Sequence, residues 1–238
     1  MGDTLYHFLY LNMKAIFSII FILTNLYTSF SQQHDNLWIS MNLGWDSFPS
    51  DPPYPANFLH FTSSPPVITY VESPYSMHSQ CLSVCNEAGI PLFFSNGYAL
   101  YHTAGELMEN GDGLNPNPLP NSYPFGYPSR AFMMALPTPG HPNDYSVLHL
   151  QFGWDSIWWL VPDLLMTSVQ GASAPGLGKV TVKNKPVISG AYWLEYFNAT
   201  KHANGRDWWV VLSDANADTQ VRTFYSYLLG PDSIALVN

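Results

Sequence analysis

No stretch of the sequence after Gln32 shows apolar residues recurring with the 3.6-residue period of a helix. Short runs rich in β-branched and aromatic residues alternate instead with turn-forming clusters, and the chain holds 20 prolines and 16 glycines. Aromatic residues make up 16% and charged residues only 11%, a balance that supports a buried core and excludes a disordered chain. The pattern predicts an all-β fold of short antiparallel strands.

Three groups of strands are expected along the chain. The first covers residues 81–85, 91–94 and 98–102, with a further short segment at 106–108. The second covers residues 131–136, 145–152, 164–169 and 179–182, and the third covers 199–203, 208–212 and 221–228. Turn residues separate the strands, and Asn96-Gly97 offers the positive φ that a tight hairpin demands. Each group is predicted to be an antiparallel β-meander.

The spacing of these groups indicates a repeat. Their first turns lie near Ala88, His141 and Asn204, a pitch of roughly 53 and then 63 residues, close to the kelch repeat of about 50. The tetrapeptide GWDS at residues 44–47 recurs at 153–156. We therefore predict antiparallel β-meander blades of a β-propeller-like repeat domain of WD or kelch type over residues 32–238.

The number of blades falls short of a closed ring. About three blades fit this sequence, whereas propellers close with four to eight. We therefore expect the domain to be incomplete, cut short at its C-terminal end. Open end sheets would leave apolar side chains partly uncovered, and the candidates are Phe93, Phe94, Trp208 and Trp209.

Residues 13–31 have the layout of a secretory signal peptide. Lys14 precedes an apolar run from Ala15 to Leu23, and small residues at Ser29 and Ser31 suit a cleavage site after Ser31. The alternative is a membrane anchor, but the apolar run is shorter than the roughly 20 residues that span a bilayer. Residues 1–12 carry no basic charge, so we interpret Met13 as the start and residues 1–12 as a start-site artefact.

Charge and cysteine content restrict the partners and the chemistry. The net charge is -9, and no Lys or Arg lies between Lys14 and Arg130, which argues against a nucleic-acid partner and against an anionic membrane surface. Cys81 and Cys85 are the only cysteines. In one strand they would lie about 13 Å apart, too far for a disulfide, so we expect two buried thiols unless the chain bends there.

Three segments resemble a known group of proteins. They are residues 82–115, which include PLFFSNG and YALYHTAGELMENGDGLNP, GLGKVTVKN at 176–184, and ATKHANGRDWWVV at 199–211. Together they resemble the N-terminal propeller region of secreted Bacteroidetes proteins that often end in a type IX secretion sorting domain. The resemblance implies a β-propeller-like domain exported to the cell surface or medium, and it implies no particular activity.

The block KHANGRDWW at residues 201–209 is the first candidate ligand site. Asn204-Gly205 is predicted to form a type I′ turn with positive φ at both residues. His202 and Asp207 could then pair across the hairpin, with Arg206 and Lys201 beside them as cations for an anionic ligand. We favour the structural alternative, in which this polar pair stabilises the hairpin.

An oxygen-rich loop at residues 109–115, ENGDGLN, is the second candidate. Asn110, Asp112 and Asn115, with backbone carbonyls, could supply ligands for Ca²⁺, which takes six to eight oxygens. The full spacing of a calcium loop is absent, so a solvated turn is favoured and no cofactor is expected, with Ca²⁺ as the alternative.

Trp154, Trp158 and Trp159 form the third candidate, because exposed aromatic rings suit stacking against neutral sugars. The alternative, favoured here, is that they fill a gap between blades. The sequence holds no catalytic motif such as Gly-x-Ser-x-Gly or His-Glu-x-x-His, so no catalytic residue is assigned. We expect a secreted or cell-surface module that binds or scaffolds an extracellular ligand or surface polymer, without membrane insertion after signal cleavage. The alternative is a secreted enzyme acting on glycans or other extracellular polymers.

Overall fold

The computed structural model describes residues 36–41, 54–73, 82–116, 127, 133–154, 159–190, 194–216 and 221–238. The chain divides into two compact units, Met1–Gln32 and Gln33–Asn238, and every described residue belongs to the second. The described ranges contain strands and no helix, so the all-β prediction is confirmed for them. No helix long and apolar enough to cross a membrane occurs in these ranges. The signal-peptide prediction, residues 1–12, Cys81 and Trp158 lie outside them.

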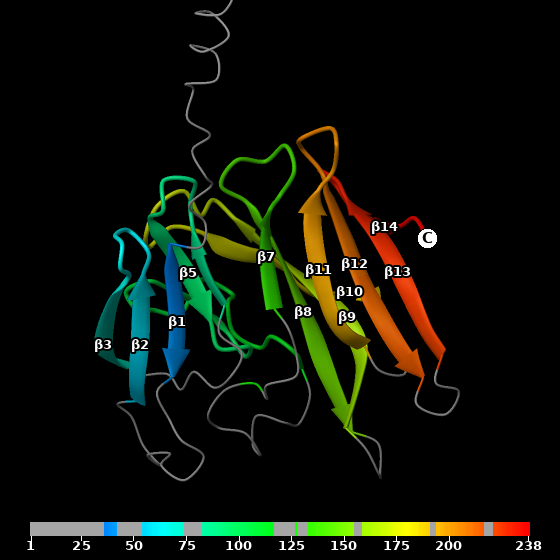
Figure 1. The fold of residues 1–238 in the computed structure, drawn as a ribbon, viewed down its shortest axis with the longest axis horizontal. Coiled ribbons are helices and arrows are strands. Elements are labelled where there is room, and N and C mark those ends of the chain that lie inside the picture. The colour runs from blue at the N-terminus through cyan, green and yellow to red at the C-terminus, as the bar shows by residue number, and fades with distance from the viewer. Residues whose placement is uncertain are drawn as a thin grey trace, which may run out of the picture. The chain divides into compact units, whose positions relative to one another are not determined.

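The strands form four antiparallel sheets, each with its strands side by side in chain order (Figure 1). The first sheet contains β1 (Leu37–Met41), β2 (Tyr54–His60) and β3 (Val67–Ser73). The second contains β4 (Leu82–Cys85), β5 (Pro91–Ser95) and β6 (Leu100–His102). The third contains β7 (Met133–Pro137), β8 (Tyr145–Trp154), β9 (Trp159–Gln170) and β10 (Lys179–Ile188). The fourth contains β11 (Leu194–Lys201), β12 (Trp208–Asn216), β13 (Val221–Leu229) and β14 (Ile234–Leu236).

The prediction of three sheets is wrong, because β1, β2 and β3 form a further sheet that the repeat spacing did not indicate. The later sheets match the prediction in part, because β9 and β11 each begin five residues earlier than expected and β14 was not expected. Each of β4, β5, β8, β10, β12 and β13 begins within one residue of its expected position. Residues 106–108 form no strand, and Leu107 makes only an isolated bridge to Tyr101.

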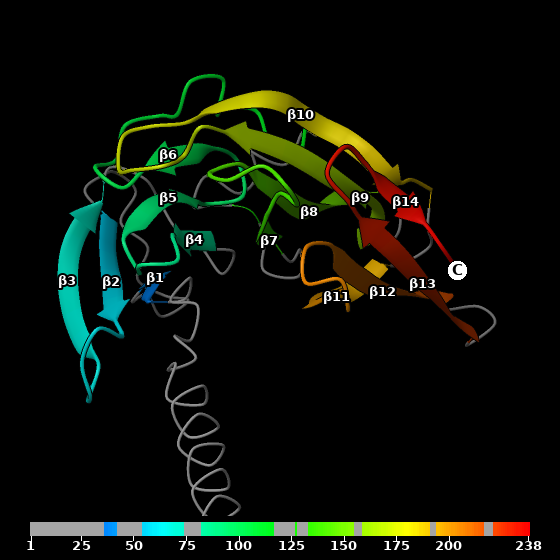
Figure 2. The ribbon, with the colours of Figure 1, turned by 90° about the horizontal axis from the view of Figure 1, so that it is seen from above.

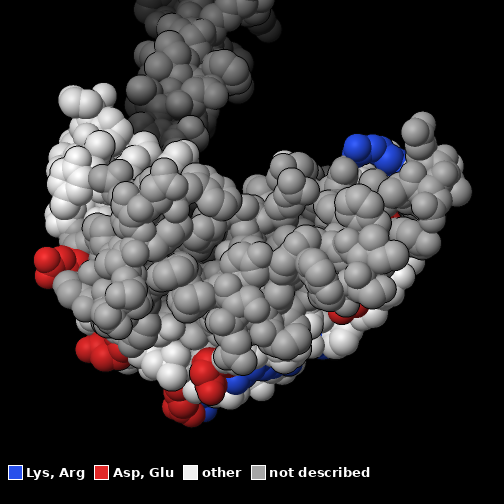
Figure 3. Space-filling view, turned by 90° about the horizontal axis from the view of Figure 1, so that it is seen from below, with Lys and Arg blue, Asp and Glu red and all other residues white. Residues whose placement is uncertain are grey.

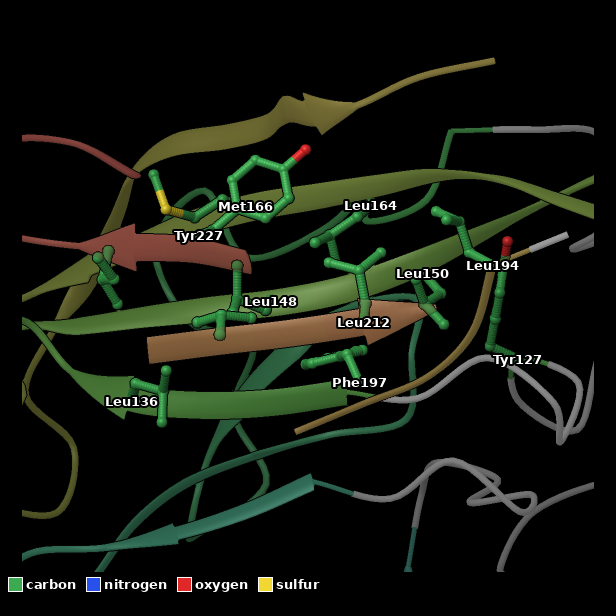
Figure 4. Close-up of a cluster of buried hydrophobic side chains, with 12 residues drawn as sticks. Tyr127, Leu136, Leu148, Leu150, Leu164, Met166, Leu194, Phe197, Leu212 and Tyr227 are labelled. Carbon is green, nitrogen blue, oxygen red and sulfur yellow. The ribbon is translucent and has the colours of Figure 1, made fainter. Parts of the chain in front are cut away.

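Three apolar clusters join the sheets in chain order. Leu37 and Ile39 of the first sheet pack with Cys85, Phe94, Ala99 and Tyr101 of the second. The second sheet packs on the third through Leu92, Phe93, Leu100, Tyr145, Val147 and Val169, among others. The third packs on the fourth through a larger cluster that includes Leu148, Leu164, Phe197 and Leu212 (Figure 4). Figure 2 shows the first sheet at one end of this series and the fourth at the other.

Burial along the strands follows from this stacking. The third sheet is covered on both faces, so Val147 lies in one cluster and its neighbour Leu148 in the next. Phe93 and Phe94 of the second sheet are 1% and 4% exposed. The expectation that these two phenylalanines would be uncovered is therefore wrong, since sheets lie on both sides of them. Trp208 and Trp209 in the fourth sheet are half-buried.

Candidate functional site

The loop between β11 and β12 is held by the carboxylate of Asp207. Arg206 Nε donates to Asp207 Oδ1 at 2.7 Å and Arg206 Nη2 donates to Oδ2 at 3.1 Å. Asn204 Nδ2 also donates to Oδ2, at 2.7 Å, while Asn204 Oδ1 accepts from the backbone N–H groups of Arg206 and Asp207. The side chains of Asn204 and Arg206 thus supply hydrogen bonds to both oxygens of the buried Asp207 carboxylate.

Two details of the predicted hairpin are wrong. Of Asn204 and Gly205, both described, only Gly205 has a positive φ, at 71°. The hydrogen bonds Gly205 N to His202 O and His202 N to Asp207 O enclose a four-residue loop, which uses an ordinary turn rather than a two-residue type I′ turn. The side chains of His202 and Asp207 do not form the predicted pair, although their backbones are hydrogen-bonded. Instead His202 Nδ1 accepts from the N–H of Asn204 at 3.1 Å.

The charges of this hairpin interact with one another. Hydrogen bonds from Arg206 and Asn204 lower the pKa of Asp207 to about 2. Lys201 Nζ lies 3.9 Å from the centroid of the Trp208 ring and donates to Arg206 O at 3.3 Å. Partial burial lowers the pKa of Lys201, although Asp207 acts in the opposite direction. Both cations that were candidates for an anionic ligand therefore contact groups of their own hairpin.

The tryptophans of the third candidate site lie elsewhere. The backbones of Trp154 and Trp159 face each other across the β8–β9 hairpin. Trp208 Nε1 donates to Pro137 O at 3.0 Å, and Pro137 pairs with Tyr145 at the opposite end of β8 from Trp154. A strand rises about 3.3 Å per residue, so the two places are about 30 Å apart. Figure 1 shows the β11–β12 loop and the β8–β9 hairpin at opposite ends of the sheets.

The three residues predicted for calcium point to different partners. Asn110 Nδ2 donates to Val180 O at 3.1 Å, and Asp112 Oδ1 accepts from Lys183 Nζ at 3.0 Å. Asn115 is fully buried, so the solvated-turn prediction is wrong for this residue. Within the described part of the chain, no group of three or more His, Cys, Asp or Glu side chains is placed to hold a metal ion.

Asn115 belongs to a buried polar network that the sequence analysis did not identify. His149 on β8 is fully buried, and its Nδ1 lies 2.7 Å from Asn115 Oδ1 while its Nε2 lies 3.0 Å from Thr167 Oγ1. Thr167 Oγ1 accepts from the N–H of Asn184 at 3.2 Å. Asn184 Oδ1 accepts from the N–H of Asn115 at 3.2 Å. Four side chains from the third sheet and the 109–115 loop thus form one connected set.

The donors and acceptors of this network fix the protonation of His149. Asn115 Nδ2 donates to Gly97 O at 3.0 Å, which leaves Asn115 Oδ1 to accept from Nδ1–H of His149. His149 Nε2 then accepts from the Thr167 hydroxyl, so the ring is neutral. Burial lowers the pKa of His149 to about 3. Since both ring nitrogens are hydrogen-bonded and no part of the ring reaches solvent, this network joins the second and third sheets rather than offering a reactive group.

The first sheet has an apolar outer face. Its inner face carries Leu37 and Ile39, so the alternate residue Trp38 points outward and is 55% exposed. Trp38 is in register with Leu59 and Ile68, and its ring centroid lies 4.9 Å from that of Phe61. Tyr70, 74% exposed, lies on the same face. We call this surface, made of Trp38, Leu59, Phe61, Ile68 and Tyr70, the β1–β3 outer face.

Asn57 adds an unusual feature to this face. It lies in register with Tyr70, and its Oδ1 is a buried acceptor without a hydrogen-bond partner among the described residues. Buried polar atoms in folded proteins are nearly always hydrogen-bonded. The β1–β3 outer face is therefore exposed and contains an acceptor without a hydrogen bond among the described residues.

The fourth sheet presents a similar surface. Val210 and Leu212 of β12 point into the core, so Trp209 and Val211 point outward. Trp209 is in register with Leu228 and Ala235. Phe224, opposite Ser213, is 64% exposed. We call the surface made of Trp209, Val211, Phe224, Leu228 and Ala235 the β11–β14 outer face.

Among the side chains that the structure describes on these two faces, the charged ones lie at the ends. Glu72, next to the last residue of β3, follows the β1–β3 outer face, and Arg222, the second residue of β13, precedes the β11–β14 outer face. Figure 3 shows several Asp and Glu side chains and a few Lys and Arg side chains along the described rim of the surface in this view. One sequence signal was available for the first face, since VITYV at residues 67–71 is apolar at almost every position and a strand with only one buried face would alternate.

Comparisons with known proteins returned no relative. No protein-family model matches the chain, and no curated protein or solved structure matches it. The residues and geometry of the chain itself are therefore the basis for assigning a function.

Proposed function

We propose that the chain is an exported, β-propeller-like binding or scaffolding module that acts at the cell surface or in the medium. Its binding surfaces are the β1–β3 outer face and the β11–β14 outer face. Four small meander sheets, each packed on the next in chain order, support the propeller-like interpretation, because propeller blades are arranged in this way.

The exposed apolar character of the two outer faces is the observation that carries the proposal. Trp38, Tyr70 and Phe224 are each more than half exposed, and Trp38 lies between Leu37 and Ile39, which are both buried. Contiguous apolar patches of this kind on a soluble protein mark interaction sites. Aromatic side chains dominate the energetics of such sites because each buries a large area on binding.

The proposed location follows from the first part of the sequence. Residues 13–31 have the layout of a signal peptide, and the segments around 82–115 and 199–211 resemble secreted Bacteroidetes proteins of the type IX secretion kind. The partner is an uncharged extracellular ligand or surface polymer, because the faces themselves carry aromatic and aliphatic side chains and almost no charge.

Co-sedimentation with insoluble neutral polysaccharides tests the binding role. Cellulose, chitin and starch granules are incubated with the native chain, with Trp38→Ala and with Tyr70→Ala, and the bound fraction is measured. We expect one or more polymers to retain the native chain and both variants to lose most of that retention while melting normally. Glu106→Gln, an exposed substitution away from both faces, is the control.

Two results would contradict the proposal. Retention that is unaffected by Trp38→Ala and by Tyr70→Ala would show that the β1–β3 outer face is not the binding surface. Release of reducing sugar ends from any of the polymers would favour the secreted enzyme instead. Export is checked in the same preparation by N-terminal sequencing, which should give a mature chain that begins at or near Gln32.

A further inference from the structure

We infer that the two outer faces also bind each other between two copies of this chain. The β1–β3 outer face of each copy packs on the β11–β14 outer face of the other. The inference rests on the proposed function, because it uses the same two surfaces. A polymer bound to either face would compete with the second copy. The same contact between unlike faces forms twice in such a dimer. All four outer faces of the two copies are then buried, and the complex closes at two copies.

The architecture of the chain favours this partner. Sheets one to four already pack face on face through three apolar clusters. Within one copy the two outer faces are both exposed, so they do not cover each other. A second copy offers the same kind of contact, sheet on sheet, at both ends of the series. Eight sheets would then follow one another, within the range of propeller rings.

The surface area that would be buried favours a dimer with two contacts over a single contact. If a whole aromatic side chain offers about 150–250 Å², the exposed residues of each outer face amount to about 350 Å². One contact would then bury about 700 Å² in total, within the range of crystal-packing contacts. Two contacts in a closed pair would bury about 1,400 Å², within the range of specific complexes.

Charge supports the pairing of unlike faces. Glu72 lies at the end of β3 and Arg222 at the start of β13, and Figure 1 shows these two strand ends at the same end of the sheets. In the dimer the sheets of the second copy continue the series of the first, with their strand ends on the same side. Glu72 of one copy therefore lies next to Arg222 of the other. A contact between two identical faces would bring together charges of one sign.

Sedimentation velocity on the purified exported chain, which begins at or near Gln32, tests the inference. From about 1 to about 100 µM, where interfaces of modest quality associate, we expect a complex of two copies and nothing larger. Tyr70→Asp and Phe224→Asp, one on each face, should each weaken association by about 30-fold, the loss typical of a central aromatic contact. Glu106→Arg, an exposed charge reversal outside both faces, should leave it unchanged.

A pair of charge reversals tests which faces meet. Glu72→Arg and Arg222→Glu should each weaken association by about three- to tenfold, and the double variant should restore it, because each contact then again contains one acid and one base. Thermal melting of each variant establishes that it folds.

Three results would overturn the inference: a monomer at the highest concentration, assemblies that keep growing with concentration, or a double variant that associates no better than the single ones. A monomer whose polysaccharide retention still depends on Tyr70 would refute only the pairing of copies. Retention and association that are both insensitive to the faces would refute the proposed function as well.

Discussion

His149 is neutral and fully buried between two hydrogen-bond partners, Asn115 and Thr167, and this makes stability depend on pH. Its pKa in the folded chain is about 3 against 6.5 for the exposed group. Between these values the unfolded chain binds a proton that the folded chain does not, so stability is complete above pH 6.5 and falls as the pH decreases. The loss is about 1 kcal/mol for each pH unit between about pH 6 and pH 3.

Urea unfolding between pH 7 and pH 4 measures this dependence, with His149→Gln as the comparison. His149→Gln is expected to be less stable at pH 7, because a glutamine amide does not have the shape of the imidazole ring in the network. It is expected to lose less stability than the native chain as the pH falls. Equal slopes for the native chain and His149→Gln would contradict the assignment.

Substitution of Gly205 introduces backbone strain without a steric clash. Its φ is 71°, and a Cβ built at this position would meet nothing within 4 Å. Gly205→Val should therefore destabilise the chain by about 1–2 kcal/mol through left-handed strain on a β-branched residue alone. Gly205→Asn should cost less, because asparagine tolerates this conformation. Urea unfolding of both variants is the measurement, and equal losses would exclude backbone strain as the cause.

Sequence patterns predicted part of the residue-scale picture. A hairpin turn at Asn204-Gly205 was predicted from this pair and is present, although Asn204 has no positive φ. The pairing of Asn115 with His149 could not be predicted, because the two residues are 34 positions apart and the sequence does not specify which sheets stack. For the same reason the sequence did not indicate that the first and third candidate sites, at His202 and at Trp154, lie at opposite ends of the sheets.

At the scale of elements, Gly111 in the loop after β6 has no positive φ, but the packing around it leaves no room for a side chain. A Cβ at Gly111 would lie 2.6 Å from Leu100 O and 2.9 Å from Met108 O. Both are backbone atoms, and Gly111 O itself accepts from the N–H of Leu100. Gly111→Ala should therefore displace the loop from β6 and destabilise the chain by about 1–3 kcal/mol, in the range of overpacked sites.

Urea unfolding of Gly111→Ala checks this expectation, with Gly171→Ala as a matched control. Gly171 has a positive φ but open space around its Cβ position, so its cost is conformational only. A loss for Gly111→Ala no larger than that for Gly171→Ala would show that the loop shifts at little cost.

Strand positions after residue 82 were predictable because turn residues separate them. Asn86 Oδ1, for example, accepts from the N–H groups of Ala88 and Ile90 and so shapes the β4–β5 turn that the sequence indicated. The first sheet was missed because β2 and β3 are joined by a Ser- and Pro-rich segment without an Asn-Gly or Asp-Gly pair. Its strand β3 also lacks the polar alternation typical of a strand at one end of a stack.

At the scale of the whole second unit, the sheets differ in how many of their faces are packed. The second and third sheets contribute to two apolar clusters each, whereas the first and fourth contribute to one. In arrays where each unit contacts only its neighbours, stability is roughly a sum of local terms. The end sheets should therefore open locally more often than the middle ones.

Hydrogen exchange followed by mass spectrometry measures this difference in the dilute chain. Amides of β2 and β13 should exchange at least about tenfold faster than those of β8, which lies between two strands and two packed faces. Raising the protein concentration should slow exchange in β2 and β13 and leave β8 unchanged, because a second copy would cover only the outer faces. The Tyr70→Asp variant should lose this concentration dependence. Uniform exchange across all four sheets would instead show that the unit opens in one cooperative step.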